Sequence, residues 1–302
     1  MKDLLKMVGL TKQALWKYNR REELNYSKIK ESIDLLQQIR KKHKRMGCRS
    51  AYYATKTKPP VGRDAFIGIG YANGFLLKRR RNKRKTTWSQ QIEVFPNLIE
   101  GKILTGINQV WQSDIFYHHQ NGKDYYGVTI IDVYSRRLLS LHLSRSLRAT
   151  ENIKALQQAI KSRSGYDLNG CIFHSDRGSQ YISDVHKQML REYHMKPSMC
   201  KIPQQNAYAE KVQDTIKNGY LVDLNFEGKN LKTLSRYVTE LYNDEKPHTS
   251  LSNMTPNRYE KYVEKLPKRE RPKELIFKWD TNFSTKSELP TKRKSDDDYD
   301  DN

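Results

Sequence analysis

The hydrophobic pattern of the chain changes near residue 105. Before this point, apolar residues recur every three or four positions between Ile29 and Ile39, which predicts an amphipathic helix over residues 26–46. After it, segments rich in β-branched and aromatic residues predict strands. We therefore expect a small, mainly helical N-terminal region over residues 1–104, followed by a domain that contains both strands and helices.

The second part opens with a predicted group of strands. The segments NQVWQSDIFY and DYYGVTIIDVYSRRLLSLHLS predict three strands joined by tight turns at Asn121-Gly122 and Ser135-Arg136. An amphipathic helix over 149–163 follows, with Thr150 as the expected N-cap. The later pattern predicts, in order, a strand at 170–173, a helix at 183–193, a strand at 195–199 and helices at 204–221 and 231–244. This order predicts an α/β fold with a mixed five-stranded sheet flanked by helices.

Charge narrows the choice of partner. The 302 residues include 56 Lys and Arg against 34 Asp and Glu, a formal net charge of +22. Such a surface attracts a polyanion and releases its counterions on binding, so nucleic acid is the first expectation and an anionic membrane surface the second. No apolar run approaches the ~18 residues needed to span a bilayer. The N-terminus lacks the apolar core of a signal peptide. We expect a cytoplasmic protein without membrane segments.

The densest basic run lies between Phe75 and Trp88. It has two interpretations: a solvated charged loop, or a basic patch on a folded DNA-binding unit. The cations that would bind DNA under the second interpretation are Lys78, Arg79, Arg80, Arg81, Lys83, Arg84 and Lys85.

Three acidic residues occupy positions from which they could meet in one cleft. Asp114 lies in the first predicted strand, Asp176 directly follows the fourth, where open α/β sheets commonly bind ligands, and Glu210 lies on the helix over 204–221. Converging carboxylates repel unless a cation holds them, and their hard oxygens suit Mg²⁺ or Mn²⁺. Each residue also has an ordinary interpretation, as a turn former, a loop cap or a solvated helix residue. Asp132 could be a turn former or a neighbour of the site.

The loop around Asp176 reads IFHSDRGSQY. We expect Gly178 to let the backbone turn tightly out of the strand. His174 is as well explained by packing as by support of the site.

Five motifs occur in the order VWQSDIFY, TIIDVYSRR, FHSDRGSQY, NAYAEKVQDTIKNGYL and YNDEKPHTSLSNMTP. In this order they resemble the transposase encoded by the second reading frame of the IS-three family of bacterial insertion sequences, whose catalytic core is similar to that of retroviral integrases. The resemblance implies an RNase H-like integrase core over 105–265. The basic helical region 1–104 would then be a DNA-binding unit, and residues 266–302 a C-terminal extension with a disordered acidic tail.

The resemblance also implies roles for individual residues. Asp114, Asp176 and Glu210 fall on the three catalytic acids, which would hold two Mg²⁺ or Mn²⁺ ions, with Asp114 bridging both. Lys217 lies seven residues after Glu210 and on the same helix face, so it could contact a DNA phosphate or be an ordinary exposed lysine. Asp214 is a rival to Glu210 one turn further on, but the motif matches Glu210.

The expected activity is that of a DNA transposase that cuts element ends and joins them to target DNA. Double-stranded DNA, a homo-oligomer assembled on it, and the product of an upstream reading frame, separate or fused, are the expected partners. One departure matters: residues 200–205 replace a glycine-containing loop that usually precedes the third acid, and the stretch is shorter. A catalytically inactive DNA-binding relic or inhibitor is therefore the alternative, and a nuclease that cleaves without joining is a third possibility.

Overall fold

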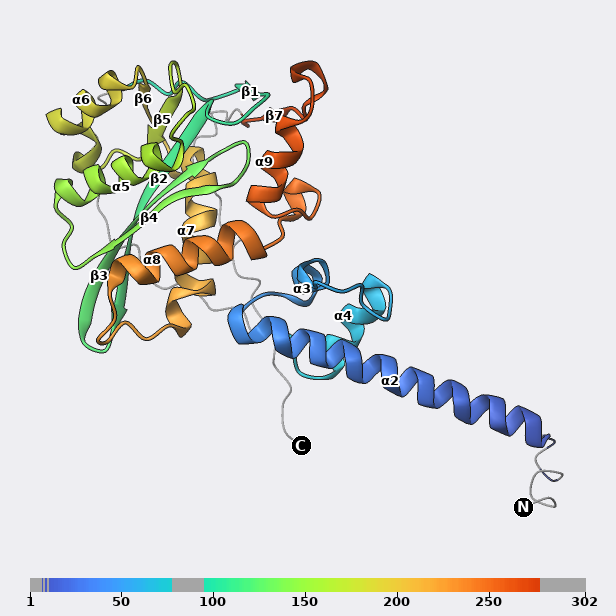
Figure 1. The fold of residues 1–302 in the computed structure, drawn as a ribbon. Coiled ribbons are helices and arrows are strands. Elements are labelled where there is room, and N and C mark those ends of the chain that lie inside the picture. Colours follow the sequence, from blue (N-terminus) through green and yellow to red (C-terminus); the bar gives the residue numbers. More distant parts are fainter. Residues whose placement is uncertain (1–6, 8, 10, 78–94, 278–302) are drawn as a thin grey trace, which may run out of the picture.

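The computed structural model describes residues 7, 9, 11–77 and 95–277, which form an N-terminal helical unit and a larger domain built on a β-sheet (Figure 1). Within these ranges, no helix is long and apolar enough to cross a membrane. The basic run at residues 78–85 and the acidic tail lie outside the described residues.

One long helix, α2 (Lys12–Lys42), dominates the N-terminal unit and projects from the rest of the molecule (Figure 1). The predicted helix was correct in type, but it both starts and ends earlier than residues 26–46. Thr11 caps its start, since the Thr11 Oγ1 accepts a hydrogen bond from the Ala14 N–H at 3.0 Å. The first buried side chain of α2 is Ser32, so its N-terminal half carries no core stripe that periodicity could detect. The C-terminal half packs on α3 (Cys48–Ala54) and α4 (Arg63–Ala72).

The larger domain contains the predicted mixed five-stranded sheet. Its strand order is β4-β3-β2-β5-β6, which places β2 at the centre. β2, β3 and β4 form antiparallel hairpins, whereas β5 and β6 run parallel to β2. The strands are β2 (Val110–Gln120), β3 (Lys123–Asp132), β4 (Leu138–Ser144), β5 (Ile172–Ser175) and β6 (Lys196–Met199).

The hairpin between β2 and β3 shows why these residues fold this way. Asn121 and Gly122 both have positive φ, 50° and 69°, as a two-residue hairpin turn of the predicted kind requires. Further along the hairpin, a Cβ on Gly127 would lie 2.1 Å from Phe116 Cζ. Glycine therefore makes room for the Phe116 ring against the neighbouring strand.

Helices cover both faces of the sheet. α5 (Ala149–Ser162) and α6 (Asp184–Glu192) lie on one face, over a core that includes Trp111 and Ile130. α7 (Ala207–Gly219) and α8 (Leu231–Glu240) lie on the other face, where Phe116 and Leu141 are buried against them. This arrangement confirms the predicted fold class, and it places α7 directly over β2 and β3.

Three predicted helix details were wrong. The N-cap of α5 is Arg148, and Thr150 is already the second helical residue. The first residues of the helix expected over 204–221 instead form a separate 3₁₀ turn, Pro203–Asn206, and α7 starts only after it. The proline at the first position of this turn favours a new helix start. The helix expected over 231–244 ends as a π-helical turn, Leu241–Glu245.

The remaining elements close the domain. α9 (Pro256–Glu264) packs on the π-helical turn, and β7 (Glu274–Leu275) pairs antiparallel with β1 (Ile103–Leu104).

The N-terminal unit contacts this domain through polar side chains that follow the end of α2. His43 Nδ1 lies 3.1 Å from the Tyr220 hydroxyl, next to the last residue of α7, and Arg45 Nε donates to Asp223 Oδ2 at 2.9 Å.

Candidate active site

Strand register places the first two candidate acids side by side. The parallel ladder between β2 and β5 ends with Gln112 opposite His174. Asp114 lies two residues beyond this last pair on β2, and Asp176 lies two residues beyond it on β5. Because parallel strands advance equally, the two carboxylates reach the same level where the strands part.

The third candidate, Glu210, lies in the first turn of α7, and β2 fixes the start of that helix. The side chain of Gln112, which is fully buried, reaches from β2 to the helix. Its Nε2 donates to the Gln205 carbonyl at 3.2 Å, and its Oε1 accepts from the Ala209 N–H at 3.1 Å. Since the first N–H groups of a helix have no intrahelical partner, Gln112 acts as a cap supplied by the strand.

Two further hydrogen bonds attach this helix to β2. Asn206 Nδ2 donates to the Ser113 carbonyl, and Gln213 Nε2 donates to the Ile115 carbonyl, both at 3.0 Å. Sequence reasoning missed these positioning residues and Gln112. The available signal was a glutamine within a buried strand, because a buried polar side chain needs a partner.

The pKa of each of the three carboxylates lies above its ordinary value. Burial raises the pKa of Asp114 to about 8, and the charges of Asp176 and then Glu210 add to the effect. Burial also raises the pKa of Asp176 and of Glu210, the latter with a contribution from Asp176. Bonds from the Ile115 N–H to Asp114 and from the Gly178 N–H to Asp176 oppose the rise only in part. The site therefore has an excess of negative charge that a cation would relieve.

The donor chemistry fits a hard divalent cation such as Mg²⁺ or Mn²⁺, because three carboxylates offer only oxygen ligands. The acids are close enough to repel one another, yet residues 11–77 and 95–277 contain no group of three or more His, Cys, Asp or Glu side chains already arranged to hold a metal. The acids are thus neighbours rather than a closed set of ligands.

The loop after β5 corrects one expectation. Gly178 has an ordinary φ of −64°, so it is not needed for a left-handed turn. A Cβ there would instead lie 3.1 Å from Asp176 Oδ1 and 2.9 Å from Gln180 Oε1, so glycine leaves room beside the carboxylate. His174 is fully buried, its Nδ1 lies 2.9 Å from Ser198 Oγ, and burial lowers its pKa to about 3. A neutral, packed histidine fits a supporting role.

The other candidates lie outside this cluster. Lys217 is half-buried two turns beyond Glu210, and burial and then the charge of Lys217 lower the pKa of His118 on β2. Asp214 accepts a hydrogen bond from Asn218 and, unlike Glu210, is not among the charges that act on Asp114. The positions of the side chains therefore favour Glu210 over Asp214 as the partner of Asp114 and Asp176.

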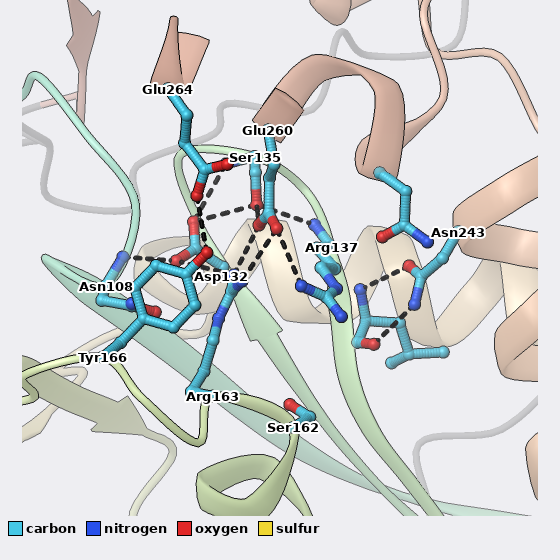
Figure 2. Close-up of polar contacts among 12 residues, drawn as sticks. Asn108, Asp132, Ser135, Arg137, Ser162, Arg163, Tyr166, Asn243, Glu260 and Glu264 are labelled. Carbon is cyan, nitrogen blue, oxygen red and sulfur yellow. Dashed lines mark hydrogen bonds and ion pairs between the residues drawn. The ribbon is translucent and has the colours of Figure 1, made fainter. Parts of the chain in front are cut away.

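Asp132 belongs to a separate buried network, shown in Figure 2. Both oxygens of Glu260, on α9, accept from Arg163, and Asp132 Oδ2 lies 3.5 Å from the same guanidinium. Asp132 also accepts from the N–H groups of Asn108 and Ser135. It joins the sheet to α9 and is not a neighbour of the three acids.

A five-stranded mixed sheet with two acids where β2 and β5 part and a third on a facing helix is the arrangement that the sequence motifs predicted for a polynucleotidyl transferase-type enzyme with an integrase core. Two sequence models of the family described as "Integrase core domain" match the chain, over residues 105–204 and 193–256. The chain belongs to the insertion-sequence transposases that carry this core, as its motifs predicted.

Similar proteins come from several bacterial elements. The chain is 30% identical over 209 residues to the uncharacterized 31 kDa protein of insertion element IS600 from Shigella sonnei, which covers 67% of this chain and 76% of that protein. It is 29% identical over 213 residues to the transposase for IS904 from Lactococcus lactis, covering 69% of this chain and 81% of the relative. It is 26% identical to the transposase InsF of IS3A from Escherichia coli over 174 residues, which cover 56% of this chain and 60% of the relative.

Solved structures of viral integrases are also similar. The HTLV-2 integrase catalytic core domain, in complex with magnesium, matches 54% of this chain and 99% of its own, with 21% identity and a TM-score of 0.41. A simian T-cell lymphotropic virus intasome chain matches 70% of each, with 14% identity and a TM-score of 0.46. The fold class of the present chain rests on its strand order and its sequence family.

Proposed function

We propose that this protein is the catalytic transposase of a bacterial insertion sequence, cleaving DNA at the element ends and joining the new 3′-hydroxyl to target DNA. One observation carries the proposal: Asp114 and Asp176 lie at matching positions beyond the β2–β5 ladder, and Glu210 is held over β2 by Gln112. Burial and mutual repulsion leave these acids in need of a cation, which is the arrangement that metal-assisted phosphoryl transfer requires.

The proposed roles of these residues follow from their positions in the fold. Asp114, Asp176 and Glu210 would hold one or two Mg²⁺ or Mn²⁺ ions, which supply charge stabilisation for the attacking and leaving oxygens of a phosphodiester. Asp114, the most buried of the three and next to both others, is the natural bridging ligand. Gln112, Asn206 and Gln213 keep α7 in place, so that Glu210 stays opposite the strand acids.

Double-stranded DNA is the proposed substrate, which agrees with the net charge of +22. We assign initial DNA binding to the N-terminal region and its basic run, and approach to the phosphates near the cleft to Lys217. Assembly into a homo-oligomer on DNA, with or without the product of an upstream reading frame, belongs to the same proposal. It fits the exposed Trp16, Leu24 and Tyr26 on the projecting part of α2.

The alternative, an inactive relic, rested on the shortened loop before Glu210. The loop is nevertheless closed by its own hydrogen bonds, since Gln205 Oε1 accepts from the Lys201 N–H at 2.6 Å. Together with the bonds from Gln112, this contact gives α7 a defined start, so the structure does not favour the alternative.

The test is a metal-dependent cleavage and strand-transfer assay on duplexes that carry the element's own ends. We expect Asp176→Asn and Glu210→Gln to abolish both steps while leaving binding to the same duplex nearly unchanged. Asp214→Asn is the matched control, because it removes a carboxylate from the same helix outside the cluster. Undiminished strand transfer by Asp176→Asn would overturn the assignment.

A further inference from the structure

A second cluster of charged side chains lies beside α7 and takes no part in the site described above. Lys211 follows Glu210 on α7, and Lys246 directly follows the π-helical turn Leu241–Glu245. The two lysines are close enough that the charge of Lys211 adds to burial in lowering the pKa of Lys246. The Lys246 Nζ also lies 6.0 Å from the centre of the Tyr242 ring.

His248 lies in the same cluster. Its ring packs edge-on against Tyr242, with ring centres 4.9 Å apart. The charges of Lys246, Arg136 and Lys211 all act on it, so three cations lie near the imidazole. Burial is the first cause that lowers its pKa, to about 3, and its Nε2 is buried without a hydrogen-bond partner among the described residues. The neutral imidazole of His248 therefore has a ring nitrogen, unpaired within the described ranges, close to several positively charged side chains.

The nearby acids are engaged elsewhere. Glu245 pairs with Lys42 at 2.8 Å and with His43 at 3.1 Å. Glu274 forms an ion pair with Arg136, whose guanidinium stacks over Tyr208 at 4.2 Å.

Asp244, which precedes Glu245, accepts from Asn257 Nδ2 at 2.6 Å. In the part of the chain that the structure describes, neither Lys211 nor Lys246 has a carboxylate within ion-pair distance.

This arrangement is unfavourable for the free protein. Burial, together with the charge of Lys211, lowers the pKa of Lys246 to about 8, because an ammonium that loses water without gaining an anion is destabilised. Lys246 is nevertheless partly exposed, so an anion can reach it from solvent. Two neighbouring ammonium groups, and an imidazole nitrogen without a partner among the described residues, together suit a phosphate oxygen, which accepts several hydrogen bonds at once.

We propose that Lys211, Lys246 and His248 form a binding site for a single backbone phosphate of the DNA substrate, beside the helix that carries Glu210. The inference rests on the proposed function, because it takes DNA as the substrate. It goes further by assigning a contact outside the carboxylate cluster: neither lysine is among the charges that act on Asp114, Asp176 or Glu210. The phosphate held there would fix the DNA strand against one side of α7 while Glu210 faces the strand acids.

The test measures binding of the full chain to a duplex of the element's terminal DNA, in chelator, over a series of salt concentrations. We expect Lys246→Gln to weaken binding several-fold and to lower the slope of log K against log salt by about one. If both lysines hold one phosphate, adding Lys211→Gln should cost little more. Lys232→Gln is the matched control, since this exposed lysine lies at the opposite end of α8.

Stability separates a binding role from a structural one. Removal of a half-buried, unpaired charge should leave the urea midpoint of the DNA-free protein unchanged or higher, whereas a structural lysine would lower it. A scan of single methylphosphonates along the duplex should then find one position at which neutralisation weakens the wild type but not Lys246→Gln.

Three results would overturn the proposal: a Lys246 variant that binds like the Lys232 control, strictly additive effects of the two lysines, or a lowered urea midpoint. Because binding is measured without metal, these results are independent of whether Asp176→Asn abolishes catalysis.

Discussion

Replacing Gln112 by Met should lower the cleavage rate by more than the accompanying loss of stability explains. Methionine keeps the length of the side chain in a fully buried position, but it removes both hydrogen bonds to the start of α7. The Gln205 carbonyl and the Ala209 N–H would lose their partner. An unsatisfied buried polar group costs roughly 1–3 kcal/mol, so the loss of both partners should lower the free energy of unfolding by roughly 2–6 kcal/mol in total.

The loss of activity should exceed this loss of stability. Without the cap from β2, the first turn of α7 is free to shift, and Glu210 shifts with it. A displacement of about 1 Å at a reacting centre can cost about 10²-fold in rate, so we expect cleavage to fall by that order under conditions where the variant is still folded. Urea unfolding measures the first effect, and the initial rate of metal-dependent cleavage of an end-containing duplex measures the second.

Gln158→Met provides the matched control. Gln158 also bridges two elements, since its Oε1 accepts from Ser140 Oγ and its Nε2 lies 3.1 Å from His142 Nδ1, but it lies on the opposite face of the sheet. The Gln158→Met variant should lose stability but cleave DNA at the rate of the wild type. The reasoning is refuted if folded Gln112→Met cleaves at the rate of the wild type, or if the two glutamine variants lose activity equally.

Two further predictions concern stability. Arg163→Met leaves the buried carboxylates of Asp132 and Glu260 without their shared cation, so the free energy of unfolding in urea should fall by about 3–5 kcal/mol. Arg137→Met removes a partly exposed cation from the same glutamate and should lower this free energy by less. Equal losses of stability in the two variants would contradict this account. Burial lowers the pKa of His186 to about 4, below its unfolded value of about 6.5, so only the unfolded state gains this proton as pH falls between these values. From pH 7 to pH 5 this histidine should therefore remove about 2 kcal/mol of stability. The His186→Phe variant should not lose this part of its stability between pH 7 and pH 5. A pH profile of stability identical to that of the wild type would contradict the prediction.

The sequence predicted the hairpins because their information is local. Asn121-Gly122 determines the turn, and alternating apolar residues determine which side of β2 and β3 is buried. Asp176 could be placed at a strand end for the same reason. The long N-terminal helix was underestimated because its exposed half has no buried stripe, so its start depended on a single cap at Thr11.

The residues that hold α7 could not be found in this way. Gln112 and Ala209 are 97 residues apart, and neither belongs to a periodic pattern that points to the other. Asn206 and Gln213 look like ordinary polar residues at the start and on the surface of a helix. Their partners are backbone carbonyls of β2, and a backbone acceptor has no signature in the side-chain sequence.

The position of Glu210 therefore depends less on the length of the preceding loop than the sequence suggested. Three side chains between α7 and β2 relate the helix to the strand that carries Asp114, so the distance between these two acids is fixed by direct contacts. At its other end α7 meets the N-terminal unit, where the Tyr220 hydroxyl lies 3.1 Å from His43. A shorter loop can be tolerated because it only has to return the chain to a helix whose place is already determined by β2. Substitutions in β2 should thus disturb the third acid more than changes in the loop itself.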